Sequence, residues 1–329
     1  MRVFVTGGTG FIGVHVAASL VAAGHEVRCL VRKTSNVGKL RELDVALTVG
    51  DVTDKDSVLE GMRDCDWAIN LANLYSFWEV DSRLYTLVNI EGTRNVMECA
   101  LEAGISKVVH VSTGGVYGKP VDCPFTENSP AGPVRFSEYF RTKYEGDLLA
   151  WGLYETAGLP LVMIYPCAVL GPGDFKASGQ YIQDLIYRRM PATVFPDSVL
   201  TWVHVKDVAA AIVKAAEKES NLGEKYLVGV HQLSLRQINK MVSEISGVPL
   251  PKLRLPNTLV IVNAWLLTWL ARLTKKPPKW GMSMDQIRTM KEGFRVDGRK
   301  VERELGISYT PIRTALEETI ASYRAQTDN

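Results

Sequence analysis

The chain has 329 residues, of which 46% are hydrophobic and 22% charged, and its 38 basic and 36 acidic side chains leave a net charge of +2. This composition is typical of a globular protein and excludes disordered, collagen-like and coiled-coil chains. A chain of this length buries a large core without disulfide bonds. The near balance of charge argues against a nucleic-acid binder, so we expect no nucleic-acid partner.

The five cysteines are odd in number and widely spaced, and they form no C-x-x-C pair; they are Cys29, Cys65, Cys99, Cys123 and Cys167. Neither a zinc site nor a disulfide framework is expected from such a pattern, which favours a cytoplasmic location and no bound metal. The first residues read as a strand rather than as a signal sequence. The longest apolar run, 258–273, is shorter than the ~20 residues of a membrane-spanning helix.

Strands and helices alternate over the first two thirds of the chain. The predicted strands are 2–6, 26–31, 45–49, 67–71, 107–112, 159–165 and 225–228. The predicted helices between them are 11–23, 81–103, 137–157 and 207–216. Such alternation predicts an α/β fold, a Rossmann-type doubly wound parallel sheet with helices on both faces.

Helical patterns dominate after residue 232, at 234–246, 258–273 and 311–324. We therefore expect a smaller, mostly helical C-terminal substrate cap. The predicted division is a nucleotide-binding domain of 1–165 with 200–228 and a cap of 166–199 with 229–329. Ligands of such sheets bind outside the carboxyl ends of the strands, so functional residues should directly follow the strands.

The first strand is followed by a glycine-rich turn, Thr6-Gly7-Gly8-Thr9-Gly10-Phe11-Ile12-Gly13, that opens a helix. Glycines at Gly7, Gly10 and Gly13 permit a tight turn and a close approach of the backbone to a pyrophosphate, which rests on the N–H groups at the helix N-terminus. Because strand, turn and helix agree, we predict a dinucleotide site that includes Thr9, Phe11 and Ile12.

The second strand ends at Arg32 and Lys33, with no carboxylate. An acidic residue here would bind a ribose 2′-hydroxyl, whereas arginine accommodates a 2′-phosphate, so NADP is favoured over NAD. The alternative is that both residues are ordinary solvated cations. After the third strand, Asp51 and Val52 stand where they could hold an adenine.

Several further motifs occur together with the glycine-rich turn: Gly50-Asp51-Val52, Asn89-Ile90-Glu91-Gly92-Thr93, Ser112-Thr113-Gly114-Gly115-Val116-Tyr117-Gly118, Tyr139-x-x-x-Lys143 and Gly171-Pro172-Gly173-Asp174. With them the chain resembles the extended short-chain dehydrogenase/reductases, the NAD-dependent epimerase/dehydratase family, over nearly its whole length. It is most similar to the dihydroflavonol-reductase and hopanoid-associated branch, above all at 85–104.

Tyr139 and Lys143 are four residues apart on a predicted helix and therefore share one face. A free tyrosine has a pKa of ~10, and a nearby ammonium would lower that pKa towards the range of a useful acid or base. The alternative is an exposed helical tyrosine, as Tyr144 would be. The resemblance implies that Lys143 also holds the nicotinamide ribose and that Thr113, rather than Ser112, binds the reacting oxygen.

The resemblance implies further roles near the cofactor. Asn89 would kink its helix and support a water relay to Lys143, and the alternative is a surface asparagine. Backbone and side-chain contacts to the cofactor are expected from residues after the fourth and sixth strands: Leu71, Ala72, Asn73, Tyr165, Pro166 and Val169. The sequence Asn70-Leu71-Ala72-Asn73 differs from the His-x-Ala-Ala of many relatives. We expect this difference to alter contacts to the cofactor or substrate, and we assign it no specific effect.

Two departures from the family narrow the reaction. Gly114 and Gly115 stand where the sugar-nucleotide dehydratases carry an Asp-Glu pair, and glycines cannot transfer a proton. Cys167 stands where epimerases commonly have an asparagine, which puts a nucleotide-sugar substrate in doubt. We predict an NADP-dependent oxidoreductase that acts on a ketone or secondary alcohol. The alternatives are a sugar epimerase that retains its cofactor and a non-catalytic NADP-binding regulator.

Aromatic residues and a basic segment bear on substrate and partners. Tyr75, Phe77 and Trp78 favour a small-molecule substrate with an apolar body, and the resemblance implies a homodimer built from 81–103 and 137–157. Residues 251–300 hold eleven basic and three acidic side chains, a net charge of +8. The apolar run 258–273 within them is either a cap helix buried over the substrate or a helix lying on an anionic membrane surface.

Overall fold

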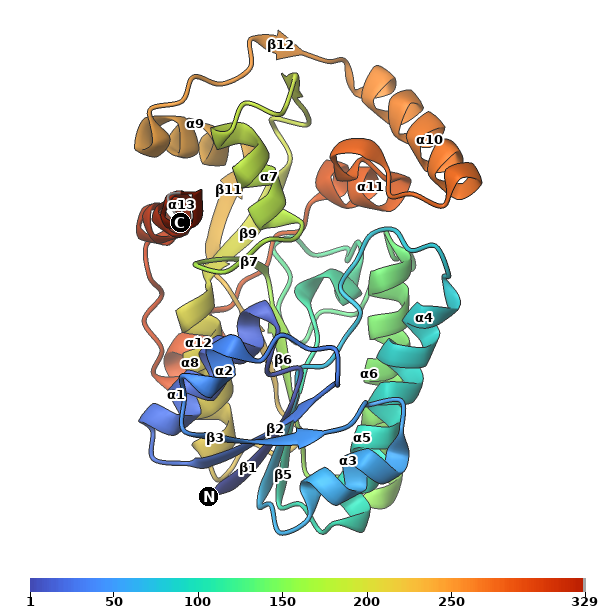
Figure 1. Cartoon of the computed structure of the whole chain (residues 1–329), viewed down its shortest axis with the longest axis vertical. Helices are drawn as coiled ribbons and strands as arrows, with labels where there is room; N and C mark the ends of the chain where they lie inside the picture. Colours follow the sequence, from blue (N-terminus) through green and yellow to red (C-terminus); the bar gives the residue numbers. More distant parts are fainter. Residues whose placement is uncertain (328–329) are drawn as a thin grey trace.

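The computed structural model describes residues 1–327 and contains a seven-stranded parallel sheet (Figure 1). Its strands lie in the order β10-β6-β5-β4-β1-β2-β3. They are β1 (Arg2–Thr6), β2 (Glu26–Val31), β3 (Val45–Val49), β4 (Trp67–Asn70), β5 (Lys107–Val111), β6 (Leu161–Pro166) and β10 (Lys225–Val228). The central strands are buried apolar runs, as expected of a sheet covered on both faces. The predicted fold class is confirmed.

Helices cover both faces of this sheet (Figure 1). One layer is formed by α1 (Phe11–Ala22), which packs against α8 (Val205–Glu217). The other is formed by α3 (Lys55–Met62), α5 (Gly92–Glu102) and α6 (Glu138–Ala157). A short helix, α2 (Gly38–Arg41), follows β2. This arrangement brings the glycine-rich turn and the helix with Tyr139 to the same edge of the sheet.

The predicted helix 81–103 contains an irregularity. It begins as α4 (Arg83–Tyr85), continues as a π-helical turn over Thr86–Glu91 and then becomes α5. Such π-helical turns are rare and often lie at functional sites. This one contains Asn89, the residue for which a kink was expected.

A second layer of elements lies above the sheet edge (Figure 1). Its strands are β7 (Ala168–Leu170), β9 (Val199–His204) and β11 (His231–Ser234) in one sheet, and β8 (Ala192–Thr193) with β12 (Leu253–Arg254) in another. Its helices are α7 (Ser178–Ile186), α9 (Leu235–Ser246), α10 (Asn257–Thr274), α11 (Met284–Glu292) and α13 (Ile312–Thr327). The C-terminal region is therefore mostly helical, as predicted.

Two main hydrophobic cores correspond to these layers. The first surrounds the parallel sheet, and the second lies among α7, α9, α13 and β9. One C-terminal segment, α12 (Arg299–Leu305), returns to the first core through Val301 and Leu305. The predicted division at residue 229 remains a prediction. α12 belongs to the predicted cap by its place in the sequence but packs into the core of the parallel sheet.

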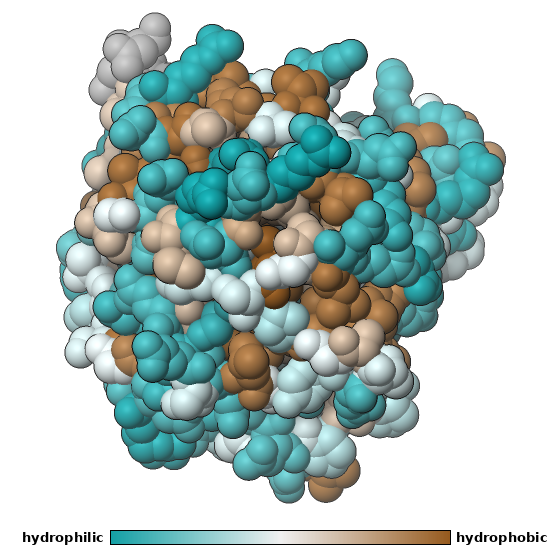
Figure 2. All heavy atoms as spheres, turned by 90° about the horizontal axis from the view of Figure 1, so that it is seen from below, coloured by the Kyte–Doolittle hydropathy of each residue, from teal (hydrophilic) through white to brown (hydrophobic). Residues whose placement is uncertain are grey.

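Hydrophilic residues predominate at the lower end of the molecule, where apolar residues show as separate patches (Figure 2). None of the helices among residues 1–327 is both long and apolar enough to cross a membrane.

Candidate functional site

The glycine-rich turn is shaped by two close approaches of the backbone. Gly7 has a φ of +70°, and a Cβ on it would lie 2.7 Å from the amide nitrogen of Ala72. A Cβ on Gly13 would lie 2.1 Å from the carbonyl oxygen of Gly7. Only glycine fits either position, so the first turn of α1 comes directly against the end of β1. This leaves a cradle of backbone N–H groups at the start of α1, which fits a dinucleotide pyrophosphate.

The end of β4 forms the next part of the site. Ala72 donates its N–H to Thr6 Oγ1 at 3.1 Å, and Leu71 donates to the carbonyl oxygen of Thr6. The amide of Asn73 donates back to the carbonyl oxygen of Leu71 at 2.9 Å. These three residues therefore follow β4 closely beside the glycine-rich turn, where the cofactor contacts were expected.

The motif Gly171-Pro172-Gly173-Asp174 closes the opposite side of the turn. His15 of α1 lies with Nε2 3.1 Å from the carbonyl oxygen of Pro172, and burial lowers the pKa of this histidine. A Cβ on Gly173 would lie 3.2 Å from Lys39 Nζ. The glycine-rich turn therefore lies between the ends of β1 and β4 and a loop from the second layer.

Arg32 and Lys33 follow β2 and are exposed. The backbone N–H of Arg32 donates to Ser35 Oγ at 3.2 Å, which folds the loop into a turn. Among the described residues, neither side chain has an ion-pair partner. Both cations are available to an anionic ligand at this end of the strand.

Asp51 and Val52 follow β3 and are held in a turn. The Asp51 carboxylate accepts hydrogen bonds from the N–H and hydroxyl of Thr53, both at 2.9 Å. Val52 is buried, and Asn95 donates to its carbonyl oxygen at 2.9 Å. Because the Asp51 carboxylate already accepts two hydrogen bonds from Thr53, Asp51 would contribute to an adenine site mainly by holding Val52 in place.

Tyr139 and Lys143 lie one turn apart on α6 and are both buried. α6 begins at an N-cap, Ser137, whose hydroxyl accepts the N–H of Phe140 at 3.2 Å and so fixes the first turn. The ammonium of Lys143 donates to the carbonyl oxygen of Val111, the last residue of β5, at 2.9 Å. The lysine therefore joins α6 to the carboxyl end of β5.

The expected lowering of the pKa of Tyr139 by the lysine is wrong. Burial raises the pKa of Tyr139 above its ordinary value, and the charge of Asp147 raises it further. Burial also lowers the pKa of Lys143, while Asp147 opposes that shift. Desolvation and the charge of Asp147 thus set the direction of the shift, and Tyr139 retains its proton at neutral pH.

Thr113 and Ser112 have different surroundings after β5. Ser112 is buried and donates to Asp147 Oδ2 at 2.7 Å. Thr113 is less buried, and its hydroxyl accepts the N–H of Gly115 at 3.3 Å. Since Ser112 is committed to a buried carboxylate, Thr113 is the hydroxyl available to a substrate. A Cβ on Gly115 would lie 2.2 Å from the Phe140 ring, so no acidic side chain fits there.

Asn89 is buried in the π-helical turn, so the alternative of a surface asparagine is wrong. Its Oδ1 accepts the N–H of Leu74 at 2.7 Å, and its Nδ2 donates to Thr142 Oγ1 at 3.0 Å. It therefore joins the loop after β4 to α6 one residue before Lys143. The part played by Asn89 in a water relay stays a prediction.

Aromatic side chains enclose Tyr139. The Tyr75 ring centroid lies 5.0 Å from that of Tyr139, and the Phe77 centroid lies 6.1 Å from it. The carbonyl oxygen of Phe77 accepts a hydrogen bond from Ser283 Oγ, at the start of α11, at 2.8 Å. The first residue of α6, Glu138, donates its N–H to Asp285 Oδ2 of α11 at 2.9 Å. The second layer thus holds the aromatic loop and the start of α6 together.

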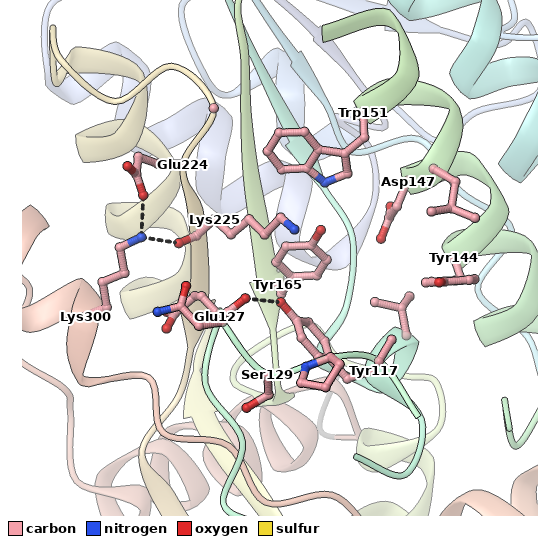
Figure 3. A pocket seen from close by; sticks show the side chains of 16 residues that line it. Tyr117, Glu127, Ser129, Tyr144, Asp147, Trp151, Tyr165, Glu224, Lys225 and Lys300 are labelled. Atoms are coloured by element: carbon pink, nitrogen blue, oxygen red, sulfur yellow. Dashed lines mark hydrogen bonds and ion pairs between the residues drawn. The ribbon is translucent and has the colours of Figure 1, made fainter. Parts of the chain in front are cut away.

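The side chain of Tyr165 faces a separate pocket. Its side chain lines a pocket of about 540 Å³ between β6, β10 and α6, together with Tyr117, Trp151 and Asp147 (Figure 3). Figure 3 also shows Lys225 and Lys300 on the opposite wall, with Lys300 ion-paired to Glu224 at 2.5 Å. Pro166 ends β6, and Val169 lies in β7. Any side-chain contact of Tyr165 would be made in this pocket rather than at the glycine-rich turn.

Sequence reasoning assigned no role to several residues near the site. Asp174, in the loop against α1, is buried, and burial raises its pKa to about 7. Burial of the Tyr75 hydroxyl raises its pKa well above the ordinary value, and the charges of Asp174 and Tyr139 raise it further. His110 and Asp147 form a buried pair beneath α6. The spacing of Asp147, four residues after Lys143, was a signal that could have been used.

The parallel sheet, the glycine-rich turn and the Tyr-x-x-x-Lys helix define an NAD(P)-dependent enzyme of the short-chain dehydrogenase/reductase type, which acts on CH–OH groups. The model of the NAD dependent epimerase/dehydratase family matches residues 3–229. The chain belongs to this family, as its motifs predicted.

Relatives of known name include both reductases and epimerases. A Synechocystis protein named dihydroflavonol 4-reductase is 32% identical over 96% of this chain and 93% of its own length. Sterol demethylase protein B of Methylococcus capsulatus is 31% identical over 98% of both chains. The crystal structure of gox2253 superposes with a TM-score of 0.85 at 32% identity over 99% of this chain and 98% of its own. A UDP-glucose 4-epimerase of Thermotoga maritima, at 22% identity over 99% of this chain and 100% of its own, shares the fold with a TM-score of 0.78.

Proposed function

We propose that the chain is an NADP-dependent oxidoreductase that interconverts a ketone and a secondary alcohol, with Tyr139 as the acid and base. The observation that carries this proposal is the buried pair on α6: Tyr139 stands among aromatic rings, and Lys143 is fixed to the end of β5 two residues before Thr113. The bound cofactor would supply or accept the hydride. All of the remaining chemistry belongs to side chains of this chain.

The raised pKa of Tyr139 suits the reductive direction. A tyrosine that keeps its proton donates its O–H to the carbonyl oxygen of a ketone, and then transfers the proton as the alcohol forms. The Thr113 hydroxyl would donate a second hydrogen bond to the same oxygen. Lys143, buried beside the end of β5, would favour the phenolate left on Tyr139.

The cofactor would be held by four groups of residues. The start of α1, from Gly7 to Gly13, would bind the pyrophosphate, and Val52 with Asp51 would bind the adenine. Leu71, Ala72 and Asn73, which follow β4, would line the nicotinamide half together with Pro166 at the end of β6 and Val169 in β7. Arg32 and Lys33, which are exposed after β2, would bind a 2′-phosphate.

The substrate would carry an apolar body. Tyr75 and Phe77 lie against Tyr139, so a molecule whose carbonyl reaches the tyrosine contacts these rings. Two relatives support this assignment by name, the sterol demethylase protein B and a ketoreductase of Stigmatella aurantiaca that acts on a farnesyl dihydroquinoline oxide. The latter is 28% identical over 75% of this chain.

The second candidate is an epimerase, because a UDP-glucose 4-epimerase of Streptomyces lividans is 26% identical over 78% of this chain. The two functions differ in cofactor exchange. Loss of NADPH absorbance should be measured against aromatic, steroidal and aliphatic ketones, and bound nucleotide should be extracted from the purified protein. A reductase turns over NADPH and exchanges it, whereas an epimerase retains nucleotide and consumes none.

We propose also that the chain forms a homodimer through α5 and α6, which lie side by side on one face of the sheet. Leu87, before α5, and Leu148, on α6, are large exposed apolar side chains that such a contact would cover. Light scattering at micromolar concentration should then give twice the mass of 36.4 kDa. A monomer would contradict this assembly.

A further inference from the structure

The helix α10 has an apolar face that the rest of the chain leaves uncovered. Its exposed large apolar side chains are Leu259, Val262, Trp265, Leu266, Trp269, Leu270 and Leu273. At 3.6 residues per turn they occupy one sector of about 140° of the helix. Trp265 is 58% exposed and Trp269 is 50% exposed. A contiguous apolar stripe of this length is unusual on a folded surface and marks a contact with something else.

The opposite side of α10 is its attachment to the protein. The side chains of Val260, Ala264 and Ala271 are buried there, and α10 packs against α11. The stripe therefore faces away from the protein, and the interpretation of 258–273 as a helix buried over the substrate is wrong. Figure 1 shows α10 at the outer edge of the second layer.

Cations surround the end of this stripe. Arg272, Lys275, Lys276 and Lys279 are exposed, and Trp280, also half exposed, follows them. Within residues 1–327 the three lysines form no ion pair. An apolar face with tryptophans, bordered by free cations, is the pattern of a helix that lies in the interface of an anionic bilayer.

We propose that α10, with the cations that follow it, binds the surface of an anionic lipid bilayer. The helix would lie in the plane of the interface rather than cross it, since no helix of residues 1–327 can span a membrane. A second copy of the chain is a poorer occupant of the same face. A two-fold contact through α10 would bring two segments of net charge +8 together, and like charges oppose such a contact.

α10 is also connected by hydrogen bonds to the loop that carries the aromatic rings near Tyr139. Thr268 of α10 accepts the N–H of Met284, the residue after Ser283, at 2.9 Å, and Ser283 in turn binds the carbonyl oxygen of Phe77. One short path of hydrogen bonds thus joins the docking helix to the aromatic rings around Tyr139.

The test is sedimentation of the full chain with vesicles of phosphatidylcholine, alone or mixed with phosphatidylglycerol. We expect binding to the mixed vesicles at low salt and release when salt is raised, because screening weakens the attraction. The double variant W265Q/W269Q should lower the partition coefficient roughly tenfold or more, as loss of about 1.4 kcal/mol already gives a factor of ten. Both tryptophans are exposed, so the variant should keep the circular dichroism and melting temperature of the parent.

Matched controls define the outcome. The double variant V121Q/L222Q, which removes exposed apolar side chains elsewhere, should bind as the parent does. K275Q/K276Q should weaken binding to the mixed vesicles, whereas K240Q, on α9, should not. Tyr139→Phe should bind normally, which separates this proposal from the proposed chemistry. Absence of binding to the mixed vesicles, unchanged binding of W265Q/W269Q, or conversion of a dimer to a monomer by that variant would overturn the proposal.

Discussion

His110 lies with Nε2 3.2 Å from Oδ1 of Asp147, and both side chains are buried beneath the helix that carries Tyr139 and Lys143. The pair ends a chain of hydrogen bonds that begins at the glycine-rich turn. Thr6 Oγ1 donates to Asn70 Oδ1 at 2.6 Å, and Asn70 Nδ2 lies 3.1 Å from His110 Nδ1. Since the asparagine Nδ2 is a donor, His110 accepts at Nδ1 and donates from Nε2 to the carboxylate.

This chain of bonds connects the glycine-rich turn with α6. Burial and the charge of Lys143 lower the pKa of His110, so the imidazole is neutral at physiological pH. It therefore links Asn70 to Asp147 through hydrogen bonds and adds no charge to the network. The charge in the network is the Asp147 carboxylate, one turn beyond Lys143 on α6. Asp147 therefore acts as a positioning residue: it orients Ser112 and His110 and favours the ammonium form of Lys143.

Replacing Asp147 by Asn should alter both stability and pH dependence. The amide keeps the size of the side chain but satisfies fewer donors, so unfolding in urea should require about 1–3 kcal/mol less free energy. Loss of the negative charge should lower the pKa of Lys143 further and move the alkaline limb of the kcat/KM profile to lower pH. Ser112→Ala, which removes one hydrogen bond and no charge, is the matched control. An unshifted profile in Asp147→Asn would contradict the role assigned here.

Asp174 should make the protein less stable as pH rises. Burial raises the pKa of this carboxyl from 3.8 to about 7, so between these values the folded state binds more protons than the unfolded state. The contribution of the protonated Asp174 carboxyl to the free energy of unfolding is therefore fully present below pH 3.8. It is lost as pH rises through about 7. Asp174→Asn keeps an acceptor for the N–H of Lys176 and should be more stable than the parent at pH 8, by up to about 4 kcal/mol.

Urea denaturation at pH 5 and pH 8 checks this expectation. The difference in unfolding free energy between parent and Asp174→Asn should grow with pH. A difference that is the same at both values would show that the carboxyl of Asp174 has an ordinary pKa.

The parallel sheet and the edge that carries the site could be predicted from the sequence because local patterns determined them. The alternation of buried runs such as Val3 to Val5 with helices requires parallel strands, whose carboxyl ends share one edge. Gly7 and Gly13 could be identified because the spacing of glycines along the chain is itself the signal for a tight turn with close backbone contacts. Tyr139 and Lys143 were placed together by the helical repeat alone.

Other features depend on contacts between distant segments. The pKa of Tyr139 follows from burial under Tyr75 and Phe77, and a spacing of four residues carries no information about that desolvation. The π-helical turn at Asn89 arises where the loop after β4 meets α6. Whether α10 was buried or exposed could not be read from its apolar run, because the answer depends on where α11 packs.

Arg32 should decide the choice between NADP and NAD. In Arg32→Asp, the cation available to a 2′-phosphate is replaced by an acceptor for a 2′-hydroxyl, so affinity for NADPH should fall roughly 10- to 100-fold while affinity for NADH rises. Dissociation constants of both nucleotides can be measured by fluorescence titration. Arg41→Asp, an exposed arginine of α2, is the control for the change of charge. If the parent binds NADH at least as tightly as NADPH, the assignment of Arg32 is wrong.

Tyr139→Phe should abolish turnover and leave cofactor binding intact. Phenylalanine fills the same space among Tyr75, Phe77 and Phe140, so the fold is preserved and only the proton donor is removed. General acid–base catalysis contributes roughly 10²- to 10⁴-fold, and kcat should fall by at least this factor with little change in the dissociation constant of NADPH. Tyr144→Phe is the matched control, because Tyr144 lies on the same helix but stacks with the Arg135 guanidinium, 3.8 Å from its ring centroid. Retained turnover in Tyr139→Phe, or an equal loss in Tyr144→Phe, would show that the proton comes from another group.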